Sequence, residues 1–337
     1  MNIIKPKKLE KGDTIGIVSP ASPLPADIPK RFERGVKCIK KLGYNVKIGK
    51  FATKKLGYMA GSPQQRLQDL NEMFGDEGVD AIICSIGGYN SNQLLDLLDY
   101  EKIKKNPKIF MGYSDITALL LAIHAKTGLV NFHGPMVMPQ FGEFPTILNF
   151  TLESMNKVLC QNNEKTVLRP AAEWTNEFLD WSKGLDNRPR KMVKNEGWKL
   201  LKEGKAKGKL IGGNLQTAQI LIGTEYMSSF DGKILFLEET ESSTVIIDRT
   251  LTHFKTLGMF DKIKGLIFGR LDRDVKINDP DYNLDKILLR ITKDYDFPVI
   301  MNMDFGHTDP TLTLPLGIEA SFDTSENTLI LEESAVL

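Results

Sequence analysis

The sequence has few of the residues that would indicate a disulfide framework or a metal site. Its 337 residues include three cysteines, Cys38, Cys84 and Cys160, and four histidines. An odd number of scattered cysteines fits neither disulfide pairing nor a zinc-binding spacing, and free thiols favour a reducing compartment. Since no H-x-x-H or H-E-x-x-H spacing occurs, we expect no zinc site.

Long apolar runs are also absent. No window approaches eighteen uncharged apolar residues, so we expect no transmembrane helix. Residues 1–8 lack the apolar stretch and cleavage site of a signal peptide. With the free thiols, these features predict a cytoplasmic protein. The net charge of +1 creates no overall field that favours nucleic acid or an anionic membrane.

Two nucleotide-binding motifs are missing as well. Neither G-x-G-x-x-G nor a P-loop occurs, so nucleotide binding by those routes is not supported. The composition, with 41% hydrophobic and 26% charged residues, is that of an ordinary globular protein. The length of 337 residues favours two domains.

The order of apolar runs and helical patterns predicts an α/β fold. In the first half, strand patterns at 14–18, 45–48 and 80–86 alternate with amphipathic helical patterns, which is typical of βαβ units and a parallel sheet. In the second half, a pattern at 320–331 indicates a hairpin. We predict an N-terminal parallel α/β domain (1–164), a long interdomain loop (165–209) and a C-terminal mixed α/β domain with more antiparallel pairing (210–337).

Ser114 lies where a predicted strand at 108–111 meets a predicted helix at 115–126. On such a turn the serine Oγ is held clear of the sheet, and the N–H of Asp115 can donate to an oxyanion in the same space. Serine is also a favoured helix N-cap. Taken alone, Ser114 fits that second interpretation better, because the second glycine of G-x-S-x-G is missing.

Two other segments carry groups suited to acyl transfer. His307 lies on a loop after a predicted strand, and loops carry catalytic groups disproportionately. His133 is the alternative base. Glu238 and Glu239 end the predicted strand at 233–237, where an acid can orient a histidine.

Six segments together resemble the family of LD-carboxypeptidases and microcin C immunity peptidases. They follow the family's order over nearly the whole chain and are highly specific as a set. The matching segments are residues 12–23, 85–89, 112–117, 212–215, 235–239 and 306–310.

This resemblance implies a Ser–His–Glu triad. Ser114 would be the nucleophile, His307 the general base and then acid, and Glu238 the residue that orients His307. We choose Glu238 over Glu239 because the family's acid directly follows the apolar strand. The pair Asp248-Arg249 also begins ten residues later (248 − 238), as the family pattern requires.

The resemblance implies several further properties. The backbone N–H groups of Gly88 and Asp115 would form the oxyanion hole. The nucleophile would belong to the N-terminal domain and the acid and base to the C-terminal domain, with the active site between them. The family also implies a homodimer and a reaction that needs no metal or organic cofactor.

The middle of the chain bears on the substrate. LD-carboxypeptidases remove the terminal D-alanine from murein tetrapeptides, whereas the immunity branch cuts the amide between an aminoacyl group and a modified nucleotide. Residues 173–181 resemble the long loop of the immunity branch, in which a tryptophan stacks on the base. Trp181 is therefore the candidate stacking residue, with Asn214 as a nearby substrate-binding residue. Trp181 could instead cover the domain interface.

The sequence thus favours a serine carboxypeptidase-type amide hydrolase that acts on small peptides or aminoacyl-nucleotides. An LD-carboxypeptidase specific for murein tetrapeptides is the first alternative. An α/β-hydrolase esterase shares the chain order serine, acid, histidine but would require the missing glycine. A non-catalytic, two-domain binding protein is the third alternative.

Overall fold

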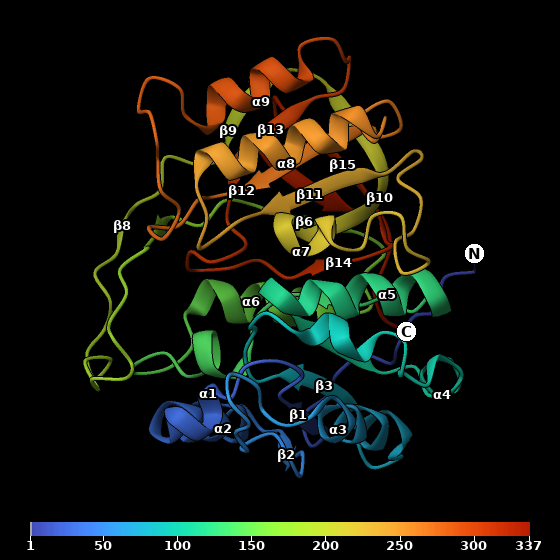
Figure 1. Ribbon diagram of the computed structural model, residues 1–337, viewed down its shortest axis with the longest axis vertical. Coiled ribbons are helices and arrows are strands. Elements are labelled where there is room, and N and C mark those ends of the chain that lie inside the picture. The colour runs from blue at the N-terminus through green and yellow to red at the C-terminus, as the bar shows by residue number, and fades with distance from the viewer. Residues whose placement is uncertain (1) are drawn as a thin grey trace.

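The computed structural model describes residues 2–337 and has two α/β halves (Figure 1). The N-terminal half, blue to green, lies below the C-terminal half, yellow to red, and each half is built on its own large sheet. This arrangement confirms the predicted fold class. Within residues 2–337, no helix combines the length and apolar character needed to cross a membrane.

The first sheet has the strand order β14-β5-β4-β3-β1-β2. All neighbours are parallel except β14 and β5, which pair antiparallel. Its strands are β1 Thr14–Val18, β2 Asn45–Ile48, β3 Ala81–Cys84, β4 Ile109–Gly112, β5 Phe132–His133 and β14 Leu314–Pro315. The strand β14 follows the His307 loop in the chain, so the sheet of the first half includes a strand from the C-terminal part.

The helices of the first half follow from local signals. In α2 the apolar stripe of Phe32, Val36 and Ile39 is buried, and Ser62 begins α3 with a capping box shared with Gln65. The helical elements are α1 Leu24–Asp27, α2 Pro29–Lys41, α3 Pro63–Gly75, η1 Ser91–Leu94, α4 Tyr100–Lys105, η2 Ser114–Ile116, α5 Thr117–Thr127, η3 Val137–Phe141 and α6 Asn149–Leu159. Because α5 lies between the two sheets, it is buried almost all round (Figure 1).

The second sheet has the strand order β6-β16-β15-β10-β11-β12-β13-β9. Its centre, from β10 to β13, is parallel, and the pairs toward both edges are antiparallel. The strands are β6 Thr166–Leu168, β9 Lys199–Lys202, β10 Lys205–Asn214, β11 Ile234–Glu238, β12 Gly265–Gly269, β13 Val299–Met303, β15 Glu319–Asp323 and β16 Thr328–Leu331. The helices are α7 Leu215–Gln219, α8 Thr244–Thr256 and α9 Leu284–Thr292.

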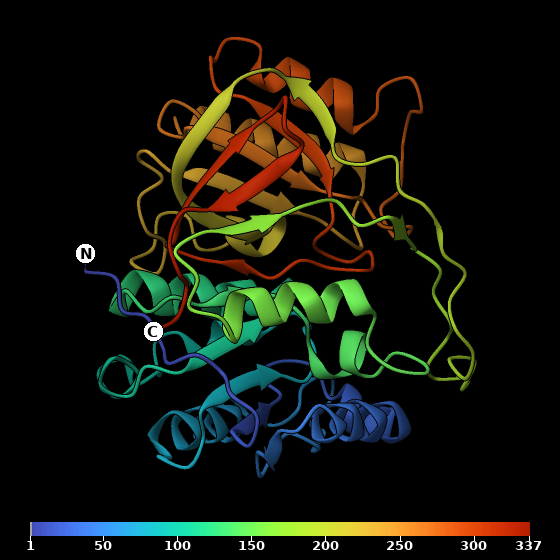
Figure 2. The same ribbon diagram turned by 180° about the vertical axis from the view of Figure 1, so that it is seen from behind.

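A long excursion connects two short strands, β7 (Glu173–Trp174) and β8 (Val193–Lys194), which pair antiparallel. We call residues 173–194 the hairpin segment. Figures 1 and 2 show that it leaves the C-terminal half and runs down one side of the molecule toward α1 and α2. One continuous piece of chain therefore spans both halves at the edge of their interface.

Candidate active site

Ser114 occupies a sharp turn between β4 and α5. Its backbone φ is 61°, a left-handed conformation that is uncommon for a residue with a side chain and often marks a functional turn. Two residues earlier, a Cβ on Gly112 would lie 2.9 Å from Cγ2 of Ile116. Gly112 therefore leaves the space that Ile116 fills, and the turn forms with isoleucine at the position where G-x-S-x-G has its second glycine.

The loop after β3 packs directly against this serine. A Cβ on Gly87 would lie 2.8 Å from Cβ and 2.9 Å from Oγ of Ser114. The neighbouring Gly88 has a φ of +152° and is packed as closely against Ser22. Gly87 thus lets the backbone of this loop approach Ser114, and Gly88, the next residue, lets the loop pack against Ser22 while it lines the same cavity as Ser114.

The side chain of Asp115 ties these two turns together. Its Oδ2 accepts a hydrogen bond from the Ser91 N–H (2.8 Å), and its backbone carbonyl accepts one from Ser91 Oγ (2.6 Å). The fully buried Arg66 donates to the carbonyls of Pro20 (2.5 Å) and Asn90 (3.1 Å). These contacts hold the Gly87–Gly88 loop in a constant position relative to Ser114 and the N–H of Asp115.

His307 and Glu238 form a hydrogen-bonded pair. The carboxylate of Glu238, fully buried at the end of β11, has Oε2 2.7 Å from Nδ1 of His307. Gly306 makes this possible, because a Cβ there, at φ +98°, would lie 2.8 Å from the same oxygen. The ring of Tyr113 meets the His307 ring edge-on at 5.0 Å. The imidazole is therefore held from two sides.

The charges of this pair shift the pKa of each partner. Burial alone would lower the pKa of His307, but the neighbouring carboxylates of Glu238, Asp272 and Glu239 together outweigh burial, so the pKa lies above its ordinary value. Burial alone would raise the pKa of Glu238, yet His307 brings it below its ordinary value. For Glu239, burial and then the charge of Glu238 raise the pKa to about 7. Glu238 is therefore the ionised acid beside the histidine, and Glu239 is readily protonated.

The two halves meet at the start of α5. The N–H of Asn214, at the end of β10, donates to Thr117 Oγ1 (3.0 Å), and a Cβ on Gly213 would lie 2.6 Å from that oxygen. The Asn214 side chain caps α7 through Thr217 and reaches Glu239 at 3.5 Å. Asn214 is buried and is not among the residues that line the cavity, and its predicted contact with substrate stays a prediction.

One cavity of about 790 Å³ brings most of the predicted residues together. That volume suits a small-molecule ligand. Predicted site residues in its lining are Ser114, His307, Gly88 and Trp181. Within residues 2–337, no hydrogen bond joins Ser114 to His307; catalytic hydrogen bonds are often long before substrate binds.

The alternative base, His133, lies elsewhere. Its ring is fully buried between the rings of Tyr113, Phe236 and Phe305 at 5.6–5.7 Å. Within residues 2–337 neither ring nitrogen has a hydrogen-bond partner, and burial lowers its pKa to about 4. His133 is thus a neutral core residue, and His307 is the histidine that faces the cavity.

The three tryptophans have different surroundings. Trp181 lines the cavity, and the Arg31 guanidinium lies 3.9 Å from its ring centroid. Trp174 lies against Arg270 at 4.3 Å, and Nε1 of Trp198 donates to Asp304 (2.8 Å). Trp181 is therefore the tryptophan available to a ligand in this cavity.

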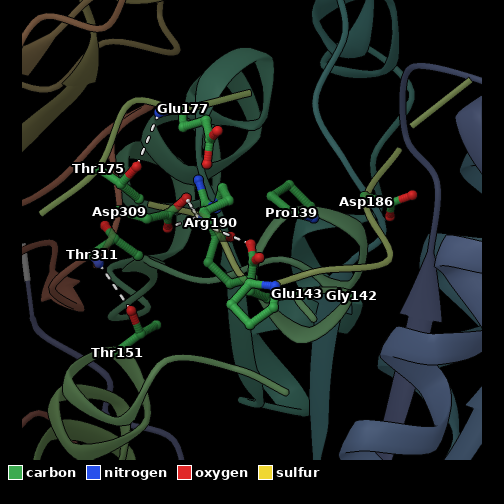
Figure 3. A network of polar contacts seen from close by, with 12 residues as sticks. Pro139, Gly142, Glu143, Thr151, Thr175, Glu177, Asp186, Arg190, Asp309 and Thr311 are labelled. Atoms are coloured by element: carbon green, nitrogen blue, oxygen red, sulfur yellow. Dashed lines mark hydrogen bonds and ion pairs between the residues drawn. The ribbon is translucent and has the colours of Figure 1, made fainter. Parts of the chain in front are cut away.

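The sequence did not reveal a buried charge network beside the cavity (Figure 3). Arg31 pairs with Asp186 at 2.7 Å, and Arg190 pairs with Glu143 at 2.7 Å and with Asp309 at 2.8 Å. The charged run around Arg190 was the only signal, and it is indistinguishable from a solvated loop by sequence. The network anchors the hairpin segment to both halves.

Known proteins are similar to this chain over nearly its whole length. Residues 15–134 match the model of the LD-carboxypeptidase N-terminal domain, and residues 207–322 match that of its C-terminal domain. A putative carboxypeptidase of Vibrio cholerae is 35% identical over 97% of both chains. The microcin C7 self-immunity protein MccF of Escherichia coli is 36% identical, covering 96% of this chain and 94% of MccF. A probable murein peptide carboxypeptidase of Bacillus subtilis is 34% identical, covering 97% and 94%.

Solved structures show the same similarity. MccF in complex with glutamyl sulfamoyl guanosine superposes with a TM-score of 0.94 at 34% identity, covering 99% of both chains. MccF in complex with aspartyl sulfamoyl adenosine gives the same TM-score and identity, covering 99% of this chain and all of the other. The chain belongs to the LD-carboxypeptidase family and is a hydrolase of the serine peptidase type.

Proposed function

We propose that this protein uses Ser114, His307 and Glu238 as a triad to hydrolyse the amide between an aminoacyl group and a nucleotide-like leaving group. The observation that carries the proposal is the cavity itself. It is lined by the strained Ser114 turn, by a histidine paired at 2.7 Å with a buried glutamate, and by Trp181. A nucleophile, a base with its orienting acid and an aromatic surface are thus available to one ligand.

The reaction would proceed by acyl transfer. His307 takes the proton of Ser114 Oγ as that oxygen attacks the amide carbonyl, and Glu238 stabilises the imidazolium that forms. The N–H groups of Gly88 and Asp115 receive the negative charge on the tetrahedral oxygen. His307 then gives its proton to the leaving nitrogen. A water, activated by the same imidazole, finally hydrolyses the ester on Ser114.

Trp181 supports the nucleotide part of the proposal. Of the three tryptophans only Trp181 lines the cavity. It lies on the hairpin segment, which runs along one side of the molecule from the C-terminal half to the N-terminal half. Stacking on a base contributes about 1–3 kcal/mol in nucleic-acid systems. The two MccF complexes contain aminoacyl sulfamoyl nucleosides, and a similar leaving group would fit this arrangement.

Cleavage of murein tetrapeptides is the second candidate, because a relative of similar identity bears the name of a murein peptide carboxypeptidase. The same triad would serve both reactions, and the difference lies in the group beyond the scissile amide. A murein peptide has no base to stack on Trp181. The predicted homodimer remains a prediction for either substrate.

A labelling experiment tests the nucleophile. A fluorophosphonate should label the wild-type protein and leave Ser114→Ala unlabelled, and the same substitution should lower kcat by several orders of magnitude. If the folded wild type stays unlabelled, or if Ser114→Ala is labelled equally, the nucleophile assignment is wrong.

A second experiment tests the leaving group. The protein is incubated separately with a murein tetrapeptide and with aspartyl sulfamoyl adenosine, and products are followed by mass spectrometry. We expect hydrolysis of the nucleoside compound, with a higher KM for Trp181→Ala. Trp174→Ala is the matched control, since Trp174 lies on the same segment but against Arg270. Cleavage of the tetrapeptide alone would contradict the proposal.

A further inference from the structure

Asp309 lies two residues after His307 and is joined to the hairpin segment by backbone pairing. The N–H of Thr175 donates to the Asp309 carbonyl (2.6 Å), and the Asp309 N–H donates to the Thr175 carbonyl (3.1 Å). The start of the hairpin segment is thus bonded directly to the loop that carries the histidine.

The far end of the hairpin segment returns to the same aspartate through Arg190. One terminal nitrogen of Arg190 lies 2.8 Å from Asp309 Oδ2 and 2.7 Å from Glu143 Oε2. Figure 3 shows the guanidinium between the two carboxylates, one from each half of the molecule. All three side chains are at most 14% exposed. In so enclosed a place, a shared cation is needed to compensate two carboxylates.

The other oxygen of Asp309 connects to the nucleophile turn. The side-chain nitrogen of Gln140 donates to Asp309 Oδ1 (3.1 Å) and to the hydroxyl of Tyr113 (3.0 Å). Tyr113 directly precedes Ser114, and its ring packs edge-on against His307. A continuous chain of polar contacts therefore runs from Arg190 through Asp309 and Gln140 to Tyr113, which precedes Ser114 and packs against His307.

Loss of Arg190 would disturb this chain of contacts at its start. Burial raises the pKa of Glu143, the charge of Arg190 acts to lower it, and the charge of Asp309 acts to raise it again. Without the Arg190 guanidinium, Glu143 would keep only the more distant Arg31 (3.7 Å), and the carboxylates of Glu143 and Asp309 would repel each other with no cation between them. Movement of Asp309 away from Glu143 would also move the His307 loop.

We propose that Arg190 is a positioning residue that acts through Asp309 to align His307 with Ser114 when the hairpin segment is docked. The proposal rests on the proposed triad. It assigns two tasks to one segment, since Trp181 meets the ligand and Arg190 aligns the base.

The test compares Arg190→Gln with Arg188→Gln. Arg188 lies on the same segment but is exposed and pairs with Glu177 at 2.7 Å, so its loss should change rates by less than about twofold. The readouts are the rate of fluorophosphonate labelling of Ser114, and kcat and KM for whichever of the two substrates the wild type hydrolyses. For Arg190→Gln we expect labelling and kcat to fall by about ten- to a hundredfold, with a smaller change in KM.

Further variants separate positioning from folding. Arg190→Lys keeps the positive charge but not the planar guanidinium, so its labelling rate should lie between those of Arg190→Gln and the wild type. If Arg190→Gln does not fold, Arg190→Lys takes its place in the comparison with Arg188→Gln. Asp309→Asn should lower the labelling rate as well, and its combination with Arg190→Gln should cause no additive loss. If the melting temperatures of these variants are close to that of the wild type, their lower labelling rates reflect a misplaced His307 and not a loss of folded protein.

Two results would overturn the proposal in distinguishable ways. Equal labelling rates for Arg190→Gln and Arg188→Gln, with a reactive wild type, would refute the role of Arg190 and leave the triad intact. So would a rise in KM with unchanged kcat and labelling. An unlabelled wild type would instead refute the nucleophile and, with it, the positioning role.

Discussion

Nδ1 of His307 lies 2.7 Å from Oε2 of Glu238, although 69 positions separate the two residues in the chain. The contact joins the end of a buried strand to the loop after β13. It orients the imidazole by the nitrogen that faces away from the proposed proton transfer, and Gly306 leaves the room for it.

Replacement of Glu238 by glutamine should remove the charge that stabilises the imidazolium. We expect kcat to fall by about 10³–10⁴-fold, the order seen when the acid of such a triad is neutralised, with little change in KM. Glu239→Gln is the matched control. Because Glu239 has a pKa of about 7 and no hydrogen bond to His307 within residues 2–337, its loss should be far smaller. Steady-state kinetics would decide, and equal losses would contradict the choice of Glu238.

The pH dependence should reflect the raised pKa of His307. His307 must be neutral to act as the base, so kcat/KM should rise with pH. The apparent pKa of this ascending limb should lie above the ordinary histidine pKa of about 6.5. In Glu238→Gln the raising carboxylate is lost while burial remains, and the limb should move to lower pH. A pH profile of kcat/KM for both proteins measures this shift, and a limb that stays in place in the variant would argue against the pair.

His133→Leu should leave the enzyme active. The change removes two ring nitrogens that lack partners, which favours the folded state by about 1–3 kcal/mol. It also removes edge-on aromatic contacts that contribute about 0.5–1.5 kcal/mol. The free energy of unfolding, measured by chemical denaturation, should therefore stay close to that of the wild type. A variant that folds but has lost fluorophosphonate labelling would make His133 a candidate base again.

Gly87→Ala should disturb the nucleophile. The new Cβ would lie 2.9 Å from Ser114 Oγ, so we expect slower labelling and a loss of about 1–3 kcal/mol in the free energy of unfolding. Gly75→Ala is the control, because its Cβ would meet only the flexible Lys102 side chain, at 3.4 Å. Labelling kinetics and thermal unfolding of the two variants would distinguish them, and equal behaviour would contradict the packing of Gly87 on Ser114.

Local pattern was enough to predict much of the fold. The strand–Gly112–Ser114–helix succession and the buried run of β11 appear in the structure as expected, because apolar periodicity and turn residues act over a few positions. In contrast, residues 90–98 contain only a 3-10 turn, Ser91–Leu94, whose position depends on a distant partner. There the N–H and Oγ of Ser91 bond to Asp115, a partner that is distant in sequence.

The amino-acid sequence by itself determined the two-part α/β organisation and the family, since both follow from ordered local segments. Residue patterns alone left His133 beside His307 and Glu239 beside Glu238, and the family resemblance chose between them. The tertiary structure shows that His307 lines the cavity while His133 is buried in the core, and that Glu238 contacts His307. Only the tertiary structure places Arg190 beside Asp309, whose charges suggest exposed loop residues until the fold buries them together. The physical reason is that burial and charge pairing depend on neighbours from distant parts of the chain, and no local pattern records those neighbours.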